Sequence, residues 1–218
     1  MDLINTSLIH KIVPPSVASP GPYPTIILLH GRGTNEDDLL GLAPYLDPRF
    51  FLVSARAPFP FPYGGHAWYE MADVGTPVGS EFDESYRRLH QFIDDVLKGY
   101  PVDPGRIFLF GFSMGSIMSL AIGLTNPDLV RGVVAHSGYV PENTSLKFKW
   151  DELSDLSLFV AHGQYDPVIP IQFGRRISEL LSKTQADFTY REYPIPHTIS
   201  EESLTDVATW LKEKALAE

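Results

Sequence analysis

One pentapeptide, Gly111-Phe112-Ser113-Met114-Gly115, has the residue types and spacing of an activated nucleophile. It matches the pattern G-x-S-x-G, follows the apolar run 107–110 and precedes a helix-like segment. In this strand–turn–helix setting the serine sits on a strained turn, and only small residues fit two positions to either side. The alternative is a chance match in a glycine-bearing turn. The flanking patterns favour a nucleophilic Ser113.

A serine hydroxyl needs a neighbouring base in order to attack at neutral pH. Among seven histidines, His197 follows a strand-like run and Pro194-Ile195-Pro196, just before the last predicted helix. In a parallel sheet, loops that follow strands meet at the carboxyl edge, where the serine turn also emerges. We therefore assign His197 as general base and then general acid. The alternative is a loop histidine without a role.

The histidine in turn needs a carboxylate that fixes its tautomer and stabilises its charge. Asp166 lies in the segment 162–168, directly after a strand-like run, whereas its rival Asp155 precedes that run and should lie at the opposite edge. The chain order Ser113, Asp166, His197 is the order of α/β hydrolases. The alternative is a turn or helix-capping aspartate.

Two backbone N–H groups are needed to hold a developing oxyanion. The turn after Ser113 aims the N–H of Met114 at the reacting carbonyl, and the loop His30-Gly31-Arg32 follows another buried strand. We assign the second N–H to Arg32; the alternative is a glycine turn that leads into a helix near Asp37. The guanidinium of Arg32 is either solvated or available to an acidic group of a substrate.

The stretch 57–71 contains five aromatic residues among prolines and glycines. Such a loop either forms the wall of an apolar pocket at the mouth of the site or anchors itself to the core. We name Trp68 as the candidate substrate contact. Exposed aromatic side chains near Phe59–Tyr69 would also favour a homodimer.

The rest of the chain alternates strand-like and helix-like runs, which predicts an α/β fold with a mostly parallel sheet and helices on both faces. Strands are expected at 3–12 (an edge strand), 25–29, 50–54, 106–112, 132–136, 156–161 and 188–193. Helices are expected around 82–96, at 113–124, at 173–181 and from Ser200 onward. We expect one domain over 1–218, with little or no cap.

The composition narrows the function classes. The 218 residues carry a formal charge of −10, which disfavours nucleic acid and anionic membrane surfaces as partners. There are no cysteines, so thiol nucleophiles and disulfides are excluded. We see no signal peptide and no run long enough to span a bilayer, and we expect a cytoplasmic protein.

In these residues and their order, the sequence resembles the small phospholipase/carboxylesterase family of α/β hydrolases, which includes acyl-protein thioesterases and bacterial carboxylesterases. The resemblance runs from about Ile26 to Leu211, and its marks are 29–31, 67–69, 111–115, 162–163, Asp166 and His197. It implies a compact α/β-hydrolase fold, no metal or organic cofactor, and oxyanion amides at Arg32 and Met114. The chain departs from many members at Met114, where they have glutamine.

We therefore expect a serine carboxylesterase that hydrolyses short- to medium-chain esters of small molecules through an acyl-enzyme. The same residues would serve an acyl thioesterase or a lysophospholipase. An alternative of another class is a binding protein that kept the fold without catalysis.

Overall fold

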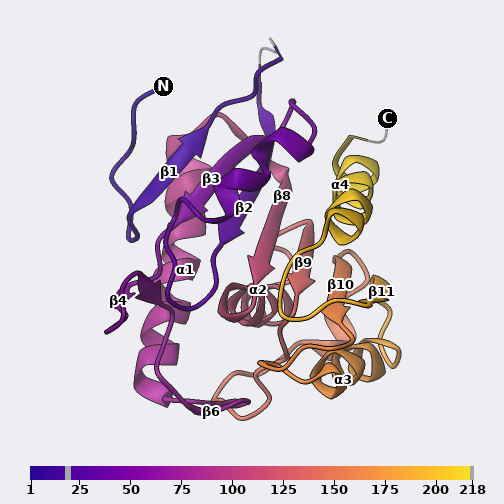
Figure 1. Ribbon diagram of the computed structural model, residues 1–218. Helices are drawn as coiled ribbons and strands as arrows, with labels where there is room; N and C mark the ends of the chain where they lie inside the picture. Colours follow the sequence, from indigo (N-terminus) through magenta and orange to yellow (C-terminus); the bar gives the residue numbers. More distant parts are fainter. Residues whose placement is uncertain (18–20, 217–218) are drawn as a thin grey trace.

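The computed structural model describes residues 1–17 and 21–216, and this part of the chain folds around a seven-stranded sheet (Figure 1). The strand order is β1-β3-β2-β8-β9-β10-β11. Every neighbouring pair is parallel except β1 with β3. The mostly parallel sheet of the prediction is confirmed. The strands are β1 (His10–Val13), β2 (Tyr23–Leu29), β3 (Phe51–Ala55), β8 (Val102–Phe112), β9 (Gly132–His136), β10 (Ser157–Gly163) and β11 (Asp187–Tyr193).

The central strands are buried on both faces, which explains their continuous apolar sequences. All residues of β3, β9 and β10 are buried. The edge strand β1 is shorter than the predicted 3–12 and begins only at His10. It pairs with β3 from His10↔Ala55 to Val13↔Leu52. One more bond, from the N–H of Arg56 to the carbonyl of Ile9 (2.8 Å), follows the end of β3 at Ala55, and the strand pairing stops there.

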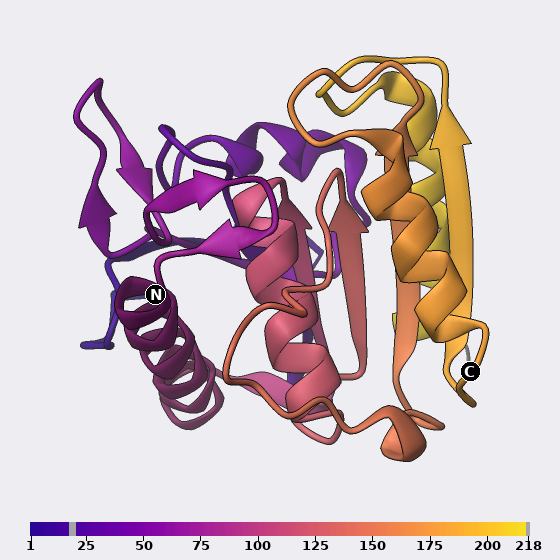
Figure 2. The same cartoon turned by 90° about the horizontal axis from the view of Figure 1, so that it is seen from below.

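The helices cover the two faces of the sheet (Figure 2). On one face lie α1 (Gly79–Gly99), α2 (Met114–Thr125) and α3 (Ile171–Leu181); on the other lie the 3-10 helix η1 (Leu39–Tyr45) and α4 (Glu201–Leu216). A second short 3-10 helix, η2, spans Trp150–Glu152. Every residue of α2 is buried, so its sequence has no polar face.

The start of α4 is fixed by two serines that bond each other reciprocally. The N–H of Ser203 donates to Ser200 Oγ (3.1 Å), and the N–H of Ser200 donates to Ser203 Oγ (3.0 Å). Each bond satisfies an N–H that has no partner inside the helix, as in a capping box. The cap therefore sets where the loop before α4, which contains His197, ends.

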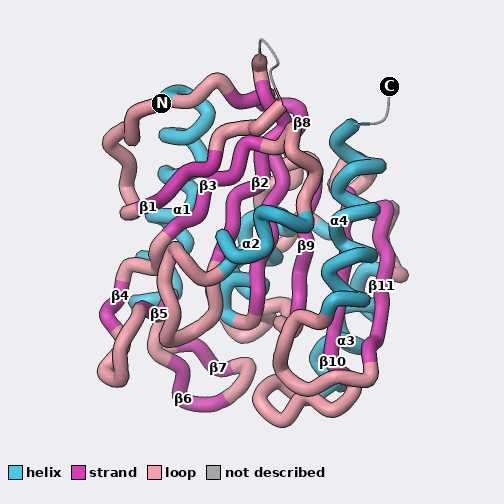
Figure 3. The backbone as a smooth tube through the Cα atoms, turned by 45° about the horizontal axis from the view of Figure 1, so that its top comes forward, coloured by secondary structure: helices cyan, strands magenta, loops and turns pink. Residues whose placement is uncertain are grey.

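Two small hairpins lie at the end of the sheet where the parallel strands finish (Figure 3). In one, β4 (Phe59–Pro60) pairs with β5 (His66–Ala67); in the other, β6 (Met71–Asp73) pairs with β7 (Thr76–Pro77). The first hairpin is formed by the aromatic stretch that the sequence singled out.

Candidate active site

Ser113 lies at the sharp turn between β8 and α2, as the pentapeptide predicts. Its backbone has φ 53° and ψ −118°, in the left-handed region that L-residues rarely adopt. Its N–H donates to the carbonyl of His136 (2.9 Å), which holds the turn against the end of β9. A strained but tethered turn keeps the serine at the carboxyl edge of the sheet.

The two glycines of the pentapeptide are required by close backbone contacts. A Cβ on Gly111 would lie 2.2 Å from the carbonyl oxygen of Gly115, and a Cβ on Gly115 would lie 1.8 Å from that of Leu29. No real side chain tolerates such distances. The glycines therefore let α2 cross directly over the ends of β8 and β2.

The structure brings Ser113, His197 and Asp166 together although they are far apart in sequence. His197 Nε2 lies 2.9 Å from Ser113 Oγ, and His197 Nδ1 lies 2.6 Å from Asp166 Oδ2. A carboxylate can only accept, so Nδ1 carries the proton and Nε2 is free to accept from the serine hydroxyl. This is the arrangement in which an imidazole can remove a proton from serine.

Asp166 is held by its own loop. Its Oδ1 accepts the N–H groups of Val168 and Ile169, both at 2.8 Å, and its side chain has no exposed surface. The buried His162 bonds through Nε2 to the carbonyl of Ile169 at 2.8 Å, and burial lowers the pKa of this imidazole. Asp155 lies before β10, at the opposite edge, where its carbonyl accepts from Arg131.

Phe112 is a residue of this site that our sequence reasoning missed. Its ring centroid lies 4.9 Å from that of His197, so it packs against the imidazole beside Ser113. The sequence pattern could have indicated this contact, because Phe112 is the variable residue that directly precedes the serine in the pentapeptide. A side chain there must emerge beside the nucleophile.

The loop after β2 passes directly against the serine. A Cβ on Gly31 would lie 3.5 Å from Ser113 Cβ and 3.2 Å from Phe112 Cδ1. Within residues 1–17 and 21–216, neither the N–H of Arg32 nor that of Met114 donates a hydrogen bond. Both predicted oxyanion amides therefore belong to segments that adjoin Ser113, and both are free to donate.

His30 fixes the conformation of this loop. Its Nε2 accepts the N–H of Ala57 (3.0 Å), so Nδ1 carries the proton and donates to the carbonyl of Gly31 (2.6 Å). Burial lowers the pKa of His30, which keeps the imidazole neutral and both bonds in place.

The expectation that Trp68 contacts the substrate is not met. Its side chain has no exposed surface, and its Nε1–H donates to the carbonyl of His30 at 3.0 Å. A buried indole has no face to offer a ligand. Trp68 instead packs beneath the surface against the loop after β2 and supports it through this bond. For this part of the aromatic stretch, the alternative interpretation, that the loop is anchored to the core, therefore holds.

An ion pair ties the same loop to the end of β3. Arg56 donates to both carboxylate oxygens of Glu36, at 2.5 and 2.6 Å, and Glu36 is only 2% exposed. These bonds to the guanidinium lower the pKa of Glu36 to about 2. The pair keeps its charges at all but strongly acidic pH.

A second buried imidazole supports the serine turn from β9. His136 Nδ1 lies 3.0 Å from Ser137 Oγ, and its Nε2 lies 3.1 Å from Ser203 Oγ in the cap of α4. Burial, together with the nearby His162 and His197, lowers the pKa of His136 to about 3. His136 is therefore neutral. It connects β9, whose last carbonyl accepts the N–H of Ser113, with α4, the helix that follows His197.

Ser113 and His197 open into a pocket of about 230 Å³. Its wall combines the loop after β2 with the loop after β10, and it is lined by Gly31, Arg32, Thr34, Asp38, Phe112, Ser113, Val168 and His197. A neighbouring pocket of about 340 Å³ is formed by the β4–β5 hairpin and includes Phe59, Phe61 and Tyr63. Arg32 lines both pockets, so the aromatic stretch does form a pocket wall next to the site.

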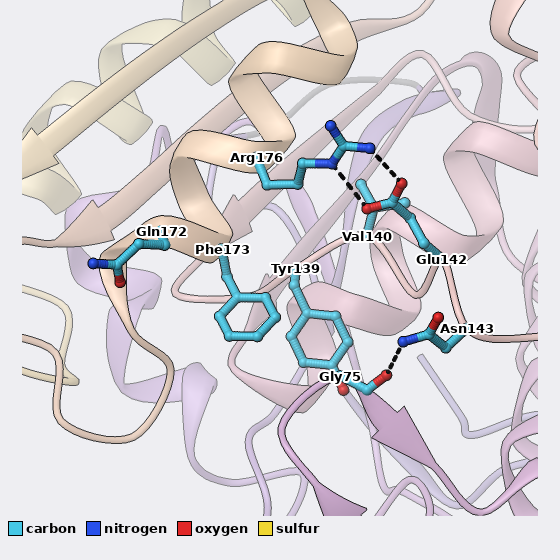
Figure 4. A pocket seen from close by; sticks show the side chains of 8 residues that line it. All are labelled: Gly75, Tyr139, Val140, Glu142, Asn143, Gln172, Phe173 and Arg176. Carbon is cyan, nitrogen blue, oxygen red and sulfur yellow. Dashed lines mark hydrogen bonds and ion pairs between the residues drawn. The ribbon is translucent and has the colours of Figure 1, made fainter.

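A third pocket, of about 210 Å³, lies between the loop after β9 and the start of α3 (Figure 4). The rings of Tyr139 and Phe173 pack 5.4 Å apart on its floor, and Arg176 is bound to Glu142 at its rim. No residue that lines it also lines the pocket of Ser113.

A mostly parallel sheet with helices on both faces, a serine on a strained strand–helix turn, and a histidine and an aspartate on later loops define an α/β hydrolase. The sequence signature of the phospholipase/carboxylesterase family matches residues 12–215. The chain belongs to this family.

Individual relatives agree with this assignment. The chain is 27% identical to acyl-protein thioesterase 1 of Mycosarcoma maydis, over 88% of this chain and 91% of that protein. It is 23% identical to the putative hydrolase MhqD of Bacillus subtilis, over 86% and 92% of the two chains. The fold matches the crystal structure of the Bacillus cereus carboxylesterase with a TM-score of 0.85, at 23% identity and 96% coverage of both chains.

Within the described residues, no helix combines the length and the apolar character needed to cross a membrane.

Proposed function

We propose that this protein is a serine carboxylesterase that hydrolyses short- to medium-chain carboxylic esters through an acyl-enzyme. The observation that carries the proposal is the unbroken hydrogen-bonded series from Ser113 Oγ through His197 to the buried carboxylate of Asp166. Family membership supports the same chemistry.

In the first half of the reaction, Ser113 Oγ attacks the ester carbonyl while His197 Nε2 takes the hydroxyl proton. Asp166 stabilises the imidazolium that forms. The tetrahedral intermediate collapses, His197 gives its proton to the leaving alcohol, and the acyl group remains on Ser113. In the second half, His197 removes a proton from water, the hydroxide attacks the acyl-enzyme, and the carboxylic acid and free serine are released.

The negative charge of each tetrahedral intermediate needs donors that are already in place. The free N–H groups of Arg32 and Met114 are the proposed donors. Met114 is the first residue of α2, so the N-terminal end of the helix dipole also favours a negative charge there.

The pocket volume supports short and medium acyl groups. A space of about 230 Å³ beside Ser113 accommodates a small ester. The relatives named acyl-protein thioesterase make thioester hydrolysis the second candidate, since the same serine, histidine and oxyanion donors would cleave a thioester.

The other expectations from the sequence stay predictions. We propose that the reaction needs no metal or organic cofactor, because serine, histidine and backbone amides supply every step above. We also propose a cytoplasmic location and no nucleic-acid partner, in keeping with the charge of −10. A homodimer through the β4–β5 hairpin is supported by Tyr63, which is 92% exposed.

The proposal is tested with p-nitrophenyl esters from acetate to palmitate, and with a fluorophosphonate probe that labels activated serines. We expect activity to peak at short or medium chains, and Ser113→Ala to abolish both hydrolysis and labelling. Ser116→Ala is the matched control, because Ser116 is buried in α2, the helix that follows Ser113, and its hydroxyl has no partner among the described residues. A folded wild-type protein that neither hydrolyses any ester nor reacts with the probe would contradict the proposal.

A further inference from the structure

Arg32 lies at the junction of two neighbouring pockets, one of which contains Ser113. It is the residue common to the pocket that holds Ser113 and His197 and the pocket formed by the β4–β5 hairpin. Because the Arg32 N–H is a proposed oxyanion donor, its side chain necessarily begins next to the reacting carbonyl. Any substrate that extends from one pocket into the other passes this side chain.

Among the described residues, no carboxylate forms an ion pair with the guanidinium of Arg32. Seven other arginines form ion pairs with carboxylates, and Arg131 bonds to a backbone carbonyl. In the part of the chain that the structure describes, only Arg32 and Arg191 have neither kind of partner. An arginine without an ion-pair partner that lines the pocket of the nucleophile differs from one on open surface, because a bound substrate would lie within its reach.

The aromatic hairpin holds this guanidinium in place without using its donors. The Cζ atom of Arg32 lies 4.7 Å from the centre of the Phe61 ring, and the Phe61 ring packs edge to face against that of Tyr63. This cation–π contact uses the charge of the guanidinium, and within residues 1–17 and 21–216 none of its five N–H groups donates a hydrogen bond. The N–H groups therefore remain available to oxygen atoms of a ligand, in the fork that suits a carboxylate.

Three carboxylates also line these pockets. Asp38 lines the pocket of Ser113, and Glu70 and Glu81 line the pocket of the hairpin, but none lies within ion-pair distance of Arg32. Oxygen of Glu81 instead accepts the N–H of Glu70. Without Arg32, these charges would repel an anionic substrate from the site.

We propose that Arg32 is a specificity-determining residue that selects esters carrying a second, anionic carboxylate group, which its guanidinium binds while Ser113 attacks the ester. This inference rests on the proposed esterase function. The carboxylate belongs either to the acyl half of the ester or to the alcohol half, and both placements bring it past Arg32.

The test compares matched esters that differ in one charge. For the acyl half, the pair is the 4-nitrophenyl half-ester of adipic acid and 4-nitrophenyl hexanoate, which have acyl chains of the same length. For the alcohol half, the pair is 3-acetoxybenzoate and its methyl ester. The quantity measured is the ratio of kcat/KM for the charged ester to that for the neutral ester, so any general damage to the oxyanion site cancels.

We expect Arg32→Gln to lower this ratio roughly 10- to 100-fold for at least one pair, chiefly through KM, which is the range for a hydrogen bond to a charged group. Arg32→Lys should keep part of the ratio, because lysine retains the charge and loses the fork. Arg191→Gln is the matched control: it removes the other unpaired arginine, which lines none of the three pockets.

The outcomes separate the two proposals. If the wild-type protein hydrolyses the neutral esters through Ser113 and Arg32→Gln leaves both ratios unchanged, the role of Arg32 is refuted and the esterase function stands. If an ester with a trimethylammonium group were hydrolysed faster than both the neutral and the anionic ester, the role of Arg32 would also be refuted. The three carboxylates of the pockets would then set the charge preference. If no ester is hydrolysed, the esterase function itself fails.

Discussion

Gly115 lies directly over the last residue of β2, so that a Cβ built on it would lie 1.8 Å from the carbonyl oxygen of Leu29. This contact joins the helix that follows the nucleophile to the strand that precedes the oxyanion loop. This backbone contact therefore helps to position Ser113, Met114 and Arg32 relative to one another, together with the side chains that hold the loop after β2.

We predict that Gly115→Ala abolishes ester hydrolysis and destabilises the fold by about 1–3 kcal/mol, because the methyl group displaces either the serine turn or the end of β2. Hydrolysis rates and urea unfolding measure the two effects. Gly41→Ala is the control, since a Cβ on Gly41 meets no atom within 4 Å. Wild-type activity in Gly115→Ala would show that the turn is not held as described.

We predict that Asp166→Asn lowers kcat by roughly 10³- to 10⁴-fold, as for the buried aspartate of serine proteases. The amide keeps one acceptor oxygen, which Val168 and Ile169 already occupy, and its NH₂ group faces His197 Nδ1, so the imidazole is driven to the wrong tautomer. Initial rates on p-nitrophenyl acetate measure the loss. Asp155→Asn, at the opposite edge of the sheet, should retain wild-type rates, and an equal loss in both variants would argue against the assignment.

We predict that the free energy of unfolding falls as the pH is lowered from about 6.5 towards 3, in part because His136 resists protonation in the folded protein. Burial lowers the pKa of His136 to about 3, whereas in the unfolded chain it has its ordinary value of about 6.5. The unfolded state therefore binds the extra proton in this window, and each pH unit costs about 1.4 kcal/mol per such histidine.

Urea unfolding at a series of pH values measures this dependence. His136→Gln keeps a side chain that can bond Ser137 and Ser203 but cannot titrate. Its free energy of unfolding should therefore depend less steeply on pH between pH 6 and 4, by the slope that corresponds to the uptake of about one proton. His90→Gln is the control, because His90 lies on α1 and has no hydrogen-bond partner among the described residues. A slope for His136→Gln equal to that of the wild-type protein would exclude His136 as a contributor.

The alternation of apolar strands and amphipathic helices determined most of the fold in advance. The strand at 132–136 was predicted with its observed bounds, and the predicted starts of α2 and α4 differ from the observed ones by one residue. These elements are strongly encoded because a buried parallel strand is predominantly apolar and a helix start must satisfy its free N–H groups. The length of β1 was not encoded locally, since it depends on how far β3 extends.

The sequence by itself also placed Ser113, Asp166 and His197 on loops at one edge of the sheet, because chain order and strand direction are enough for that. Only the tertiary structure decided which of the aromatic residues of 57–71 face a pocket. Trp68 and Phe61 belong to the same stretch, yet one is fully buried under His30 and the other supports the guanidinium of Arg32. The difference arises from packing between loops distant in sequence, which no local pattern of residue types records.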